Sequence, residues 1–391
     1  QRMSGVKTVL DEDEFLNFDK ILREKKIFIS PDGTFNASLA LKNLYLLLPS
    51  SEFDTEGMAE FRREFAFAES LKIKPSVVTT RKIVGKKTAK PAPPVEPKSL
   101  FEIQEGKPIF EELRLVKSPF EIKLLQHAID ITTEAQMRSM GMVNRANWEY
   151  EVQAEVEYTF RRRNADYWGY PSIVGCGPNA TTLHYIESQS EIKKGDLLLM
   201  DVGAEYDHYT ADVTRTFPTN GKFTKEQAEI YQIVYDAQEA AAKAIKPGAN
   251  FNAPSEAASE VIKEGLFKLG LITDKNSGQH QMWYMHGWGH WLGMNVHDVG
   301  NYGATFKPGM VMTNEPGIYI REDALNYLPD TPANKEFIAK VRPIFERYKN
   351  IGVRIEDDML VTENGVEWMT KALPREINQV QAFMEKAKEE M

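Results

Sequence analysis

The sequence predicts an α+β protein, with a smaller α/β domain at residues 1–111 and a larger α+β domain at residues 112–391. Its length of 391 residues is more than one hydrophobic core usually supports. Residues 86–99 hold four prolines and four lysines, a composition typical of a linker or an extended surface loop. Beyond that segment, helical and strand-forming runs come in blocks, which favours antiparallel pairing of the strands.

The predicted small domain alternates short strand-like runs with one helical stretch. The runs KKIFIS at 25–30 and NLYLLL at 43–48 are rich in residues that favour strands. A helix is expected at about 58–70. This alternation predicts a small α/β unit before the proline-rich segment.

Four amphipathic helices are expected in the larger domain. The first begins at Ser118, followed by Pro119 at the first helical position and Glu121 as the partner in a capping box. Hydrophobic residues then recur on one face of that helix, at Ile122, Leu125 and Ile129. The other three helices are predicted at about 147–162, 224–246 and 255–269.

Four strand-forming runs of the larger domain each carry one acid among aliphatic residues: Asp201, Asp212, Glu315 and Glu356. The strands are predicted at 196–203, 210–217, 309–320 and 351–362. The connection between the first two is typical of a hairpin, which would bring Asp201 and Asp212 together. A buried unpaired ion costs several kcal/mol, so the acids need protons, metal ions or a basic partner, for which Arg215 is a candidate.

Five histidines lie in the same domain: His184, His208, His286, His290 and His297. The spacing of His286 and His290 invites comparison with H-E-x-x-H, but HGWGH has two glycines and no glutamate. This glycine-rich aromatic segment suits the lining of a pocket better. Two Asp, two Glu and one His fit a two-metal site, which activates water and polarises a carbonyl for amide or ester hydrolysis. Oxygen ligands with one imidazole favour Mn, Co, Fe or Zn.

Four segments together resemble the Xaa-Pro peptidases of the pita-bread metallopeptidase family, and most closely its aminopeptidase P group, which is related to prolidase. They are MDVGAEYDHYTADVTRTFPTNGKFT, MHGWGHWLGMNVHDVG, MVMTNEPGIYI and GVRIEDDMLVTENG. They occur in the family's order, within a resemblance that covers about residues 112–376. The resemblance implies a pita-bread (creatinase/aminopeptidase-like) catalytic domain at 112–391 and a creatinase-like N-terminal domain at 1–111. The N-terminal domain is expected to be incomplete, because the chain begins with Gln1.

The resemblance also implies a ligand set for two divalent ions, Mn²⁺ by preference, with Co²⁺ or Zn²⁺ as alternatives. The five implied ligands are Asp201, Asp212, His290, Glu315 and Glu356. Asp212 and Glu356 would bridge both ions, Asp201 would complete one, and His290 and Glu315 would complete the other. The nucleophile implied is a hydroxide that bridges the metals.

Catalytic and substrate-binding roles follow from the resemblance in the same way. Glu315 would shuttle the proton, and His297 would steady the substrate carbonyl and the tetrahedral intermediate. His184 would be a further catalytic residue on the substrate side of the pocket. His286 and Arg354 would lie around the proline side of the scissile bond.

The predicted activity is hydrolysis of the peptide bond between an N-terminal residue and a following proline. Prolidase, which cleaves only Xaa-Pro dipeptides, is the alternative, because residues 324–350 form an insertion of the kind found in some prolidases. A catalytically dead binding module and a metal-free hydrolase like creatinase are disfavoured, because the sequence keeps all five implied ligands.

Partners and location are expected from bulk properties and from the family. The net charge of −9 does not favour nucleic acid or an anionic membrane surface. A single cysteine, Cys176, fits a reducing compartment, and no run reaches the 18 apolar residues of a transmembrane helix. With no signal peptide in the visible chain, we expect a cytoplasmic protein. The family implies a homo-oligomer, either a dimer or a tetramer, that acts on peptides with proline at the second position.

Overall fold

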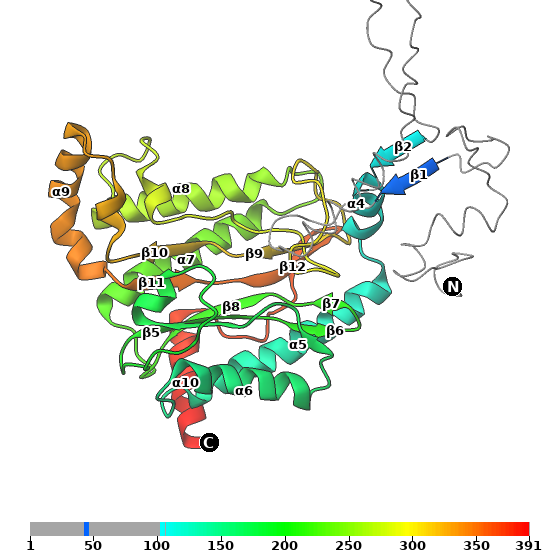
Figure 1. Ribbon diagram of the computed structural model, residues 1–391, viewed down its shortest axis with the longest axis horizontal. Coiled ribbons are helices and arrows are strands. Elements are labelled where there is room, and N and C mark those ends of the chain that lie inside the picture. The colour runs from blue at the N-terminus through cyan, green and yellow to red at the C-terminus, as the bar shows by residue number, and fades with distance from the viewer. Residues whose placement is uncertain (1–42, 47–101, 106, 391) are drawn as a thin grey trace, which may run out of the picture. The chain divides into compact units, whose positions relative to one another are not determined.

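The computed structural model describes residues 43–46, 102–105 and 107–390 (Figure 1). The chain divides into two compact units, Gln1–Phe110 and Glu111–Met391. In the first unit, strand β1 (Asn43–Leu46) pairs in parallel with β2 (Glu102–Glu105). The predicted strand at 25–30, the helix at 58–70 and the proline-rich segment at 86–99 lie outside the described residues.

Helix α4 (Lys107–Leu115) spans the boundary between the two units. The long helix α5 (Pro119–Met142) follows and packs into the hydrophobic core of the N-terminal half of the second unit. The predicted capping box of Ser118 and Glu121 is confirmed at the start of α5, and Leu125 and Ile129 are fully buried. Helix α6 (Glu149–Arg162) packs beside α5 and starts two residues later than predicted. The strands of this half are β3 (Tyr167–Trp168), β4 (Ile173–Cys176), β5 (Leu197–Val202), β6 (Ala204–Tyr206), β7 (Tyr209–Thr210) and β8 (Val213–Pro218), and a 3₁₀ turn η1 (Gly177–Thr181) follows β4.

A second core forms between α7 (Lys225–Ala244), α8 (Asn252–Leu269) and the later strands. Thr224 caps α7 through a capping box with Gln227, so this helix begins where the sequence predicts. The other elements are η2 (Gln279–Met282), β9 (Val311–Asn314), β10 (Gly317–Ile320), η3 (Ala324–Tyr327), α9 (Pro332–Tyr348), β11 (Ile351–Arg354), β12 (Asp357–Thr362), β13 (Gly365–Trp368) and α10 (Ile377–Glu390). Helix α9 and η3 occupy the insertion at 324–350.

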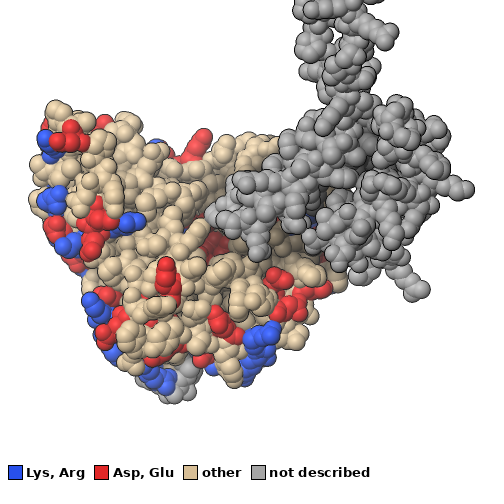
Figure 2. Space-filling view, in the orientation of Figure 1, with Lys and Arg blue, Asp and Glu red and all other residues tan. Residues whose placement is uncertain are grey.

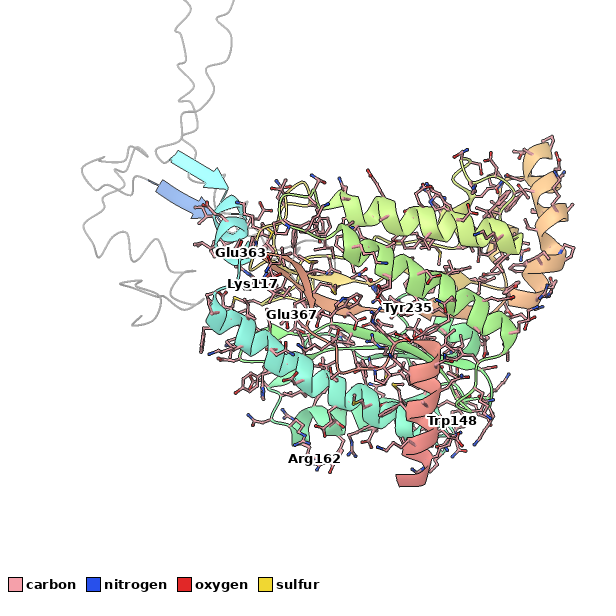
Figure 3. All side chains as sticks on the ribbon, turned by 180° about the vertical axis from the view of Figure 1, so that it is seen from behind. Lys117, Trp148, Arg162, Tyr235, Glu363 and Glu367 are labelled. Carbon is pink, nitrogen blue, oxygen red and sulfur yellow. The ribbon has the colours of Figure 1, made fainter. Side chains whose placement is uncertain are left out.

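Strands of the second unit run between the helix pair α7–α8 and the pair α5–α6 (Figure 1). The sheets have the orders β4-β5-β8, β13-β12-β9, β3-β6-β7 and β10-β11, and all of these pairs are antiparallel. This mixture of helices with antiparallel strands confirms the predicted α+β class of the larger domain. Seen from behind, α5 and α7 both cover the strands (Figure 3).

Both of the long strands predicted for the C-terminal half are broken at an acid. The run 309–320 forms β9 and β10 with Glu315 in the gap, where Pro316 removes a backbone donor. The run 351–362 forms β11 and β12 with Glu356 in the gap. The two runs pair with each other on both sides of the break, β9 with β12 and β10 with β11. Each glutamate therefore lies where this ladder is interrupted, rather than within a regular strand.

A tight hairpin joins β6 and β7, as the sequence predicts for the connection between Asp201 and Asp212. Asp207 and His208 form its two-residue loop, with φ of 48° and 68°. Positive φ at both positions is the mark of a type I′ turn, whose twist matches that of the flanking strands. His208 is thus an exposed turn residue. The hairpin returns the chain to β8, which pairs with β5 along its length.

The described surface of the second unit carries charges of both signs. On the face in Figure 2, Lys and Arg side chains lie mainly along the left and lower edges, where they are interspersed with Asp and Glu. Within the part of the chain that the structure describes, no helix combines the length and apolar character that crossing a membrane requires.

Candidate metal centre

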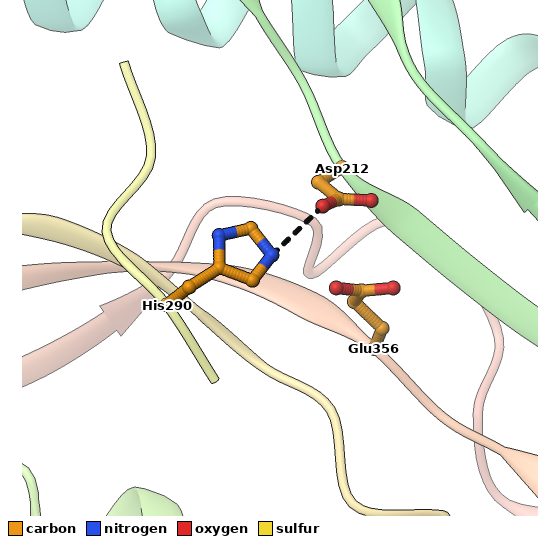
Figure 4. Close-up of side chains that lie close together, drawn as sticks. All are labelled: Asp212, His290 and Glu356. Carbon is orange, nitrogen blue, oxygen red and sulfur yellow. Dashed lines mark ion pairs between the residues drawn. The ribbon is translucent and has the colours of Figure 1, made fainter. Parts of the chain in front are cut away.

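Three buried or half-buried side chains from distant parts of the sequence converge between the two halves of the second unit. One ligand atom each from Asp212, His290 and Glu356 lies within 4.8 Å of the others (Figure 4). Asp212 directly precedes β8, Glu356 lies between β11 and β12, and His290 comes from the irregular segment before β9. The Oγ1 of Thr214 donates to Glu356 Oε2 at 2.6 Å and connects the two halves at this point.

Asp201 and Asp212 meet as the sequence predicts, through a residue that the sequence analysis did not select. The Tyr170 hydroxyl lies 2.5 Å from one carboxylate oxygen of each aspartate. A phenol has one proton, so it can donate to only one of these oxygens at a time. The other aspartate needs a proton or a cation of its own.

Arg354, rather than Arg215, is the basic partner of Asp201. The Arg354 guanidinium donates to Asp201 Oδ2 at 2.5 Å and to the Tyr319 hydroxyl at 2.9 Å. Arg215 instead pairs with Asp357 at 2.6 Å, and both side chains are 1% exposed. The sequence-based choice of Arg215 was therefore wrong, because strand register decides which carboxylate each arginine faces.

His290 presents one ring nitrogen to the carboxylates. Its Nδ1 lies 3.0 Å from the Trp291 carbonyl, which can only accept, so Nδ1 carries the proton. In the neutral ring, Nε2 then holds the free lone pair that binds metals. This atom lies 3.2 Å from Asp212 Oδ2 and 3.4 Å from Glu315 Oε1. Glu315 also accepts a hydrogen bond from Thr313 Oγ1 at 3.1 Å.

The electrostatics of the cluster show too many negative charges for its cations. Burial, followed by the charges of Asp201 and Glu315, raises the pKa of Asp212 well above its usual range. Burial and the charges of Asp212 and Glu315 do the same to the pKa of Glu356. For Asp201, burial is outweighed by Arg354 and by hydrogen bonds, which lower the pKa. Oxygen donors with one imidazole, buried and short of positive charge, fit divalent metal ions.

Three further histidines predicted for the site lie around this cluster. His297 packs edge-on against His290, with 4.4 Å between ring centroids. Burial and the neighbouring His290 lower the pKa of His297 to about 4. Nδ1 of His286 lies 3.7 Å from Glu315 Oε2, and its Nε2 lies 2.7 Å from the Tyr319 hydroxyl. The exposed His184 is close enough for its charge to contribute to the lowered pKa of both His286 and His297.

Some residues of the site escaped the sequence analysis. Tyr170 and Thr214 contact the candidate ligands, and the Asp358 carboxylate accepts the backbone N–H of Asp212 at 3.2 Å. The Tyr319 hydroxyl contacts Arg354 and His286. Tyr319, Thr214 and Asp358 lie in segments that carry the resemblance, so a signal for them was present. Their contacts could not be read from the sequence, because they depend on strand register and tertiary packing.

Comparisons with known proteins agree on one family. The model of metallopeptidase family M24 matches residues 123–363. The Xaa-Pro aminopeptidase of Haemophilus influenzae is 42% identical over 295 residues, which cover 72% of this chain and 64% of the relative. The Xaa-Pro aminopeptidase of Escherichia coli is 39% identical over 295 residues, which cover 73% of this chain and 63% of the relative. The chain thus spans less than two thirds of the length of either relative.

Solved structures of aminopeptidases P also match this chain. Zn-substituted E. coli aminopeptidase P in complex with product superposes with a TM-score of 0.66 and 37% identity, covering 75% of this chain and 64% of that one. The aminopeptidase PepP of Pseudomonas aeruginosa superposes with a TM-score of 0.68 and 35% identity, covering 89% of this chain and 72% of that one.

Proposed function

The chain belongs to metallopeptidase family M24, and from this premise we propose that it is a dinuclear metal-dependent Xaa-Pro aminopeptidase. It would hydrolyse the bond between an N-terminal residue and a following proline. The observation that carries the proposal is the convergence of Asp212, His290 and Glu356 within 4.8 Å in a buried, negatively charged site. Relatives with this named activity, at 42% and 39% identity, support the choice of reaction.

Two divalent ions are proposed for the site, held by Asp201, Asp212, His290, Glu315 and Glu356. When bound, such ions lower the pKa of water and polarise a carbonyl. Mn²⁺ is the proposed metal, because the donors are mostly oxygen, and Co²⁺ or Zn²⁺ suit the same set. A solved relative described as Zn-substituted supports this flexibility.

Side chains of the protein would carry the proton and hold the substrate. Glu315 is 16% exposed and lies at the edge of the ligand cluster, where its carboxylate can take a proton and return it to the leaving proline nitrogen. His297 is proposed to donate a hydrogen bond to the scissile carbonyl oxygen, which suits a ring that its pKa of about 4 keeps neutral. His184, His286 and Arg354 are proposed to border the bound peptide, with Arg354 also holding Asp201.

The remaining expectations are proposals of the same kind. Residues 1–111 are proposed to be the creatinase-like N-terminal domain that limits substrate length, and residues 112–391 the catalytic domain. We propose a homo-oligomer in the cytoplasm, with peptides as its substrates and no nucleic acid or membrane as a partner. Sedimentation velocity and cell fractionation would test assembly and location separately.

A comparison of two substrates tests the reaction. Mn-loaded protein should release Arg from Arg-Pro-Pro-Gly, and protein stripped of metal by chelation should not. Cleavage of Gly-Pro but not of the tetrapeptide would identify the prolidase alternative, for which the helix α9 in the insertion is the motivating feature. Failure to cleave either peptide with metal bound would contradict both assignments.

A further inference from the structure

Two buried glutamines occupy matching places in the two halves of the second unit. Gln136 lies on α5 and Gln238 on α7, the helices that cover the strands in Figure 3, and both are 0% exposed. Each side chain points its amide nitrogen at backbone carbonyls of the strands beneath. Those carbonyls belong to residues directly next to the candidate metal ligands.

Gln136 joins the two strands that carry the aspartates. Its Nε2 donates to the carbonyl oxygens of Met200 at 3.2 Å and Val213 at 2.7 Å. Met200 directly precedes Asp201, and Val213 directly follows Asp212. One amide group therefore contacts the backbone beside both carboxylates, in addition to the ladder that pairs β5 with β8.

Gln238 does the same for the two glutamates. Its Nε2 donates to the carbonyl oxygens of Asn314 at 3.0 Å and Ile355 at 3.1 Å. Asn314 directly precedes Glu315, and Ile355 directly precedes Glu356. Asn314 ends β9, and Ile355 lies in the break between β11 and β12, where the ladder between the two runs is interrupted. The backbone N–H groups of Glu315 and Glu356 donate to the carbonyls of Trp288 and Thr214 instead. The amide of Gln238 adds a link between the two runs beside the break.

The orientation of both amides follows from their partners. A carbonyl only accepts hydrogen bonds, so the NH₂ group must face it. For Gln238, the side-chain oxygen also accepts from Arg375 at 3.3 Å. Asp357 Oδ2 lies 2.7 Å from Nε2, so the two protons of this nitrogen are shared among the carboxylate and the two carbonyls. For Gln136, the side-chain oxygen is buried and has no hydrogen-bond partner among the residues that the structure describes.

That oxygen is a cost of placing an amide on α5 to donate to the Met200 and Val213 carbonyls. Burying an unsatisfied polar atom costs about 1–3 kcal/mol, and an apolar residue on α5 would avoid this cost. The position of the amide over two ligand-flanking carbonyls gives the glutamine a reason to be there. Groups that hydrogen-bond directly to metal ligands orient them, and their loss commonly weakens metal binding about 10–100-fold. The two glutamines act one residue away from the ligands, through the backbone.

We propose that Gln136 and Gln238 are positioning residues, each of which sets the separation of two carboxylates so that together they form a site for divalent metal. Gln136 acts on Asp201 and Asp212, and Gln238 acts on Glu315 and Glu356. The inference rests on the metal centre proposed above. It adds that the affinity of the centre is determined by one glutamine from each long helix.

The test measures metal affinity rather than activity. Gln136→Met and Gln238→Met keep the length of the side chain and remove its donors. Titration calorimetry of the metal-free proteins with MnCl₂ should show a Kd raised about tenfold or more for each variant. Gln227→Met is the matched control, because Gln227 is also a nearly buried glutamine of α7, and its Nε2 donates to the Gly195 carbonyl at 2.8 Å, beside no candidate ligand. Its Kd should stay within about twofold of wild type.

The outcomes separate this inference from the function on which it rests. If wild-type protein does not bind Mn²⁺, the metal centre itself is refuted. If wild type binds and both Met variants bind equally well, with a lower Tm as their only defect, the glutamines are structural and the inference is overturned. Should a Met variant fail to fold, Gln136→Asn and Gln238→Asn keep the amide but shorten its reach by one methylene. An unchanged Kd in those folded variants would also overturn it.

Discussion

Two buried charged clusters of the second unit differ in how their charge is balanced. Around Asp298, one carboxylate faces both Arg114 and Lys117, and Asp298 and Lys117 are 5% and 4% exposed. At the candidate metal centre, Asp212 and Glu356 are just as deeply buried, at 4% and 1%. The arginine near them, Arg354, hydrogen-bonds to Asp201 and lies 3.9 Å from Glu356.

The difference distinguishes a structural cluster from a binding site. Taking charges out of water costs several kcal/mol for each ion, and the protein recovers this when opposite charges meet in good geometry. The Asp298 cluster contains its own cations, including Lys117 just before α5 (Figure 3). The metal centre has an excess of acids, and their raised pKa values express it. An excess of buried charge with no protein partner is what an external cation would relieve.

The largest expected effect comes from removing one acid of the metal centre. Asp212→Asn should lower kcat/KM on a Xaa-Pro peptide by about 10³-fold or more, because it removes a proposed metal ligand and metals supply several kcal/mol of catalysis. Metal-free Asp212→Asn should nevertheless be at least as stable as metal-free wild type, because the substitution removes a buried carboxylate that Asp201 and Glu315 repel. Peptide hydrolysis and thermal unfolding of the chelated proteins measure the two effects.

A stable but inactive variant would distinguish the centre from an ordinary ion pair. Mn²⁺ should raise the Tm of wild type and leave that of Asp212→Asn nearly unchanged. Wild-type activity in the variant would remove Asp212 from the site. A large loss of stability in the metal-free variant would show that the charge excess at this position is balanced by the protein after all.

Features set by a few neighbouring residues could be predicted from the sequence, whereas features set by strand register and tertiary packing could not. The start of α5 was predicted, because a capping box is contained in the four residues from Ser118 to Glu121. The meeting of Asp201 with Asp212 was predicted because a short hairpin joins them. The partner of Arg215 was not, since a shift of one residue in register would turn its side chain to the opposite face of the sheet. Tertiary packing, rather than residue type, assigns Arg215 to Asp357 and Arg354 to Asp201.

A smaller effect is expected at the Asp298 cluster, where the substitution should lower the stability of the metal-free protein rather than preserve it. Asp298→Asn leaves Lys117 buried beside Arg114 without a carboxylate, although burial lowers the pKa of Lys117 and eases its loss of a proton. We expect the free energy of unfolding to fall by about 3 kcal/mol. Urea denaturation of the metal-free variant measures this. Adding Lys117→Met to Asp298→Asn should recover part of the lost free energy of unfolding. If it recovers none, the loss comes from the segment around His297 and Asp298 rather than from the unpaired lysine.

The smallest effect is a pH dependence that the metal should abolish. Asp212 and Glu356 have raised pKa values in the folded, metal-free protein, whereas unfolded carboxyls titrate at about 4. Their protonation therefore stabilises the fold fully below pH 4, and this contribution is lost as the pH rises through the folded pKa. Each tenfold difference in proton affinity between the folded and unfolded chain is worth about 1.4 kcal/mol. Tm of the chelated protein should thus fall with rising pH above 4.

Protonation of His297 changes the stability of the metal-free protein in the opposite direction, so the effect of the carboxylate has to be measured as a difference between two proteins. The folded pKa of His297, about 4, lies below the unfolded value of about 6.5, so its contribution is complete above pH 6.5 and is lost as the pH falls towards 4. Because His297 is common to both proteins, the difference in Tm between wild type and Asp212→Asn isolates the carboxylate. That difference should shift further against wild type as the pH rises from 4 to 8, and saturating Mn²⁺ should reverse it. A difference that does not change with pH would mean that the acid is already neutralised within the protein, as Asp298 is.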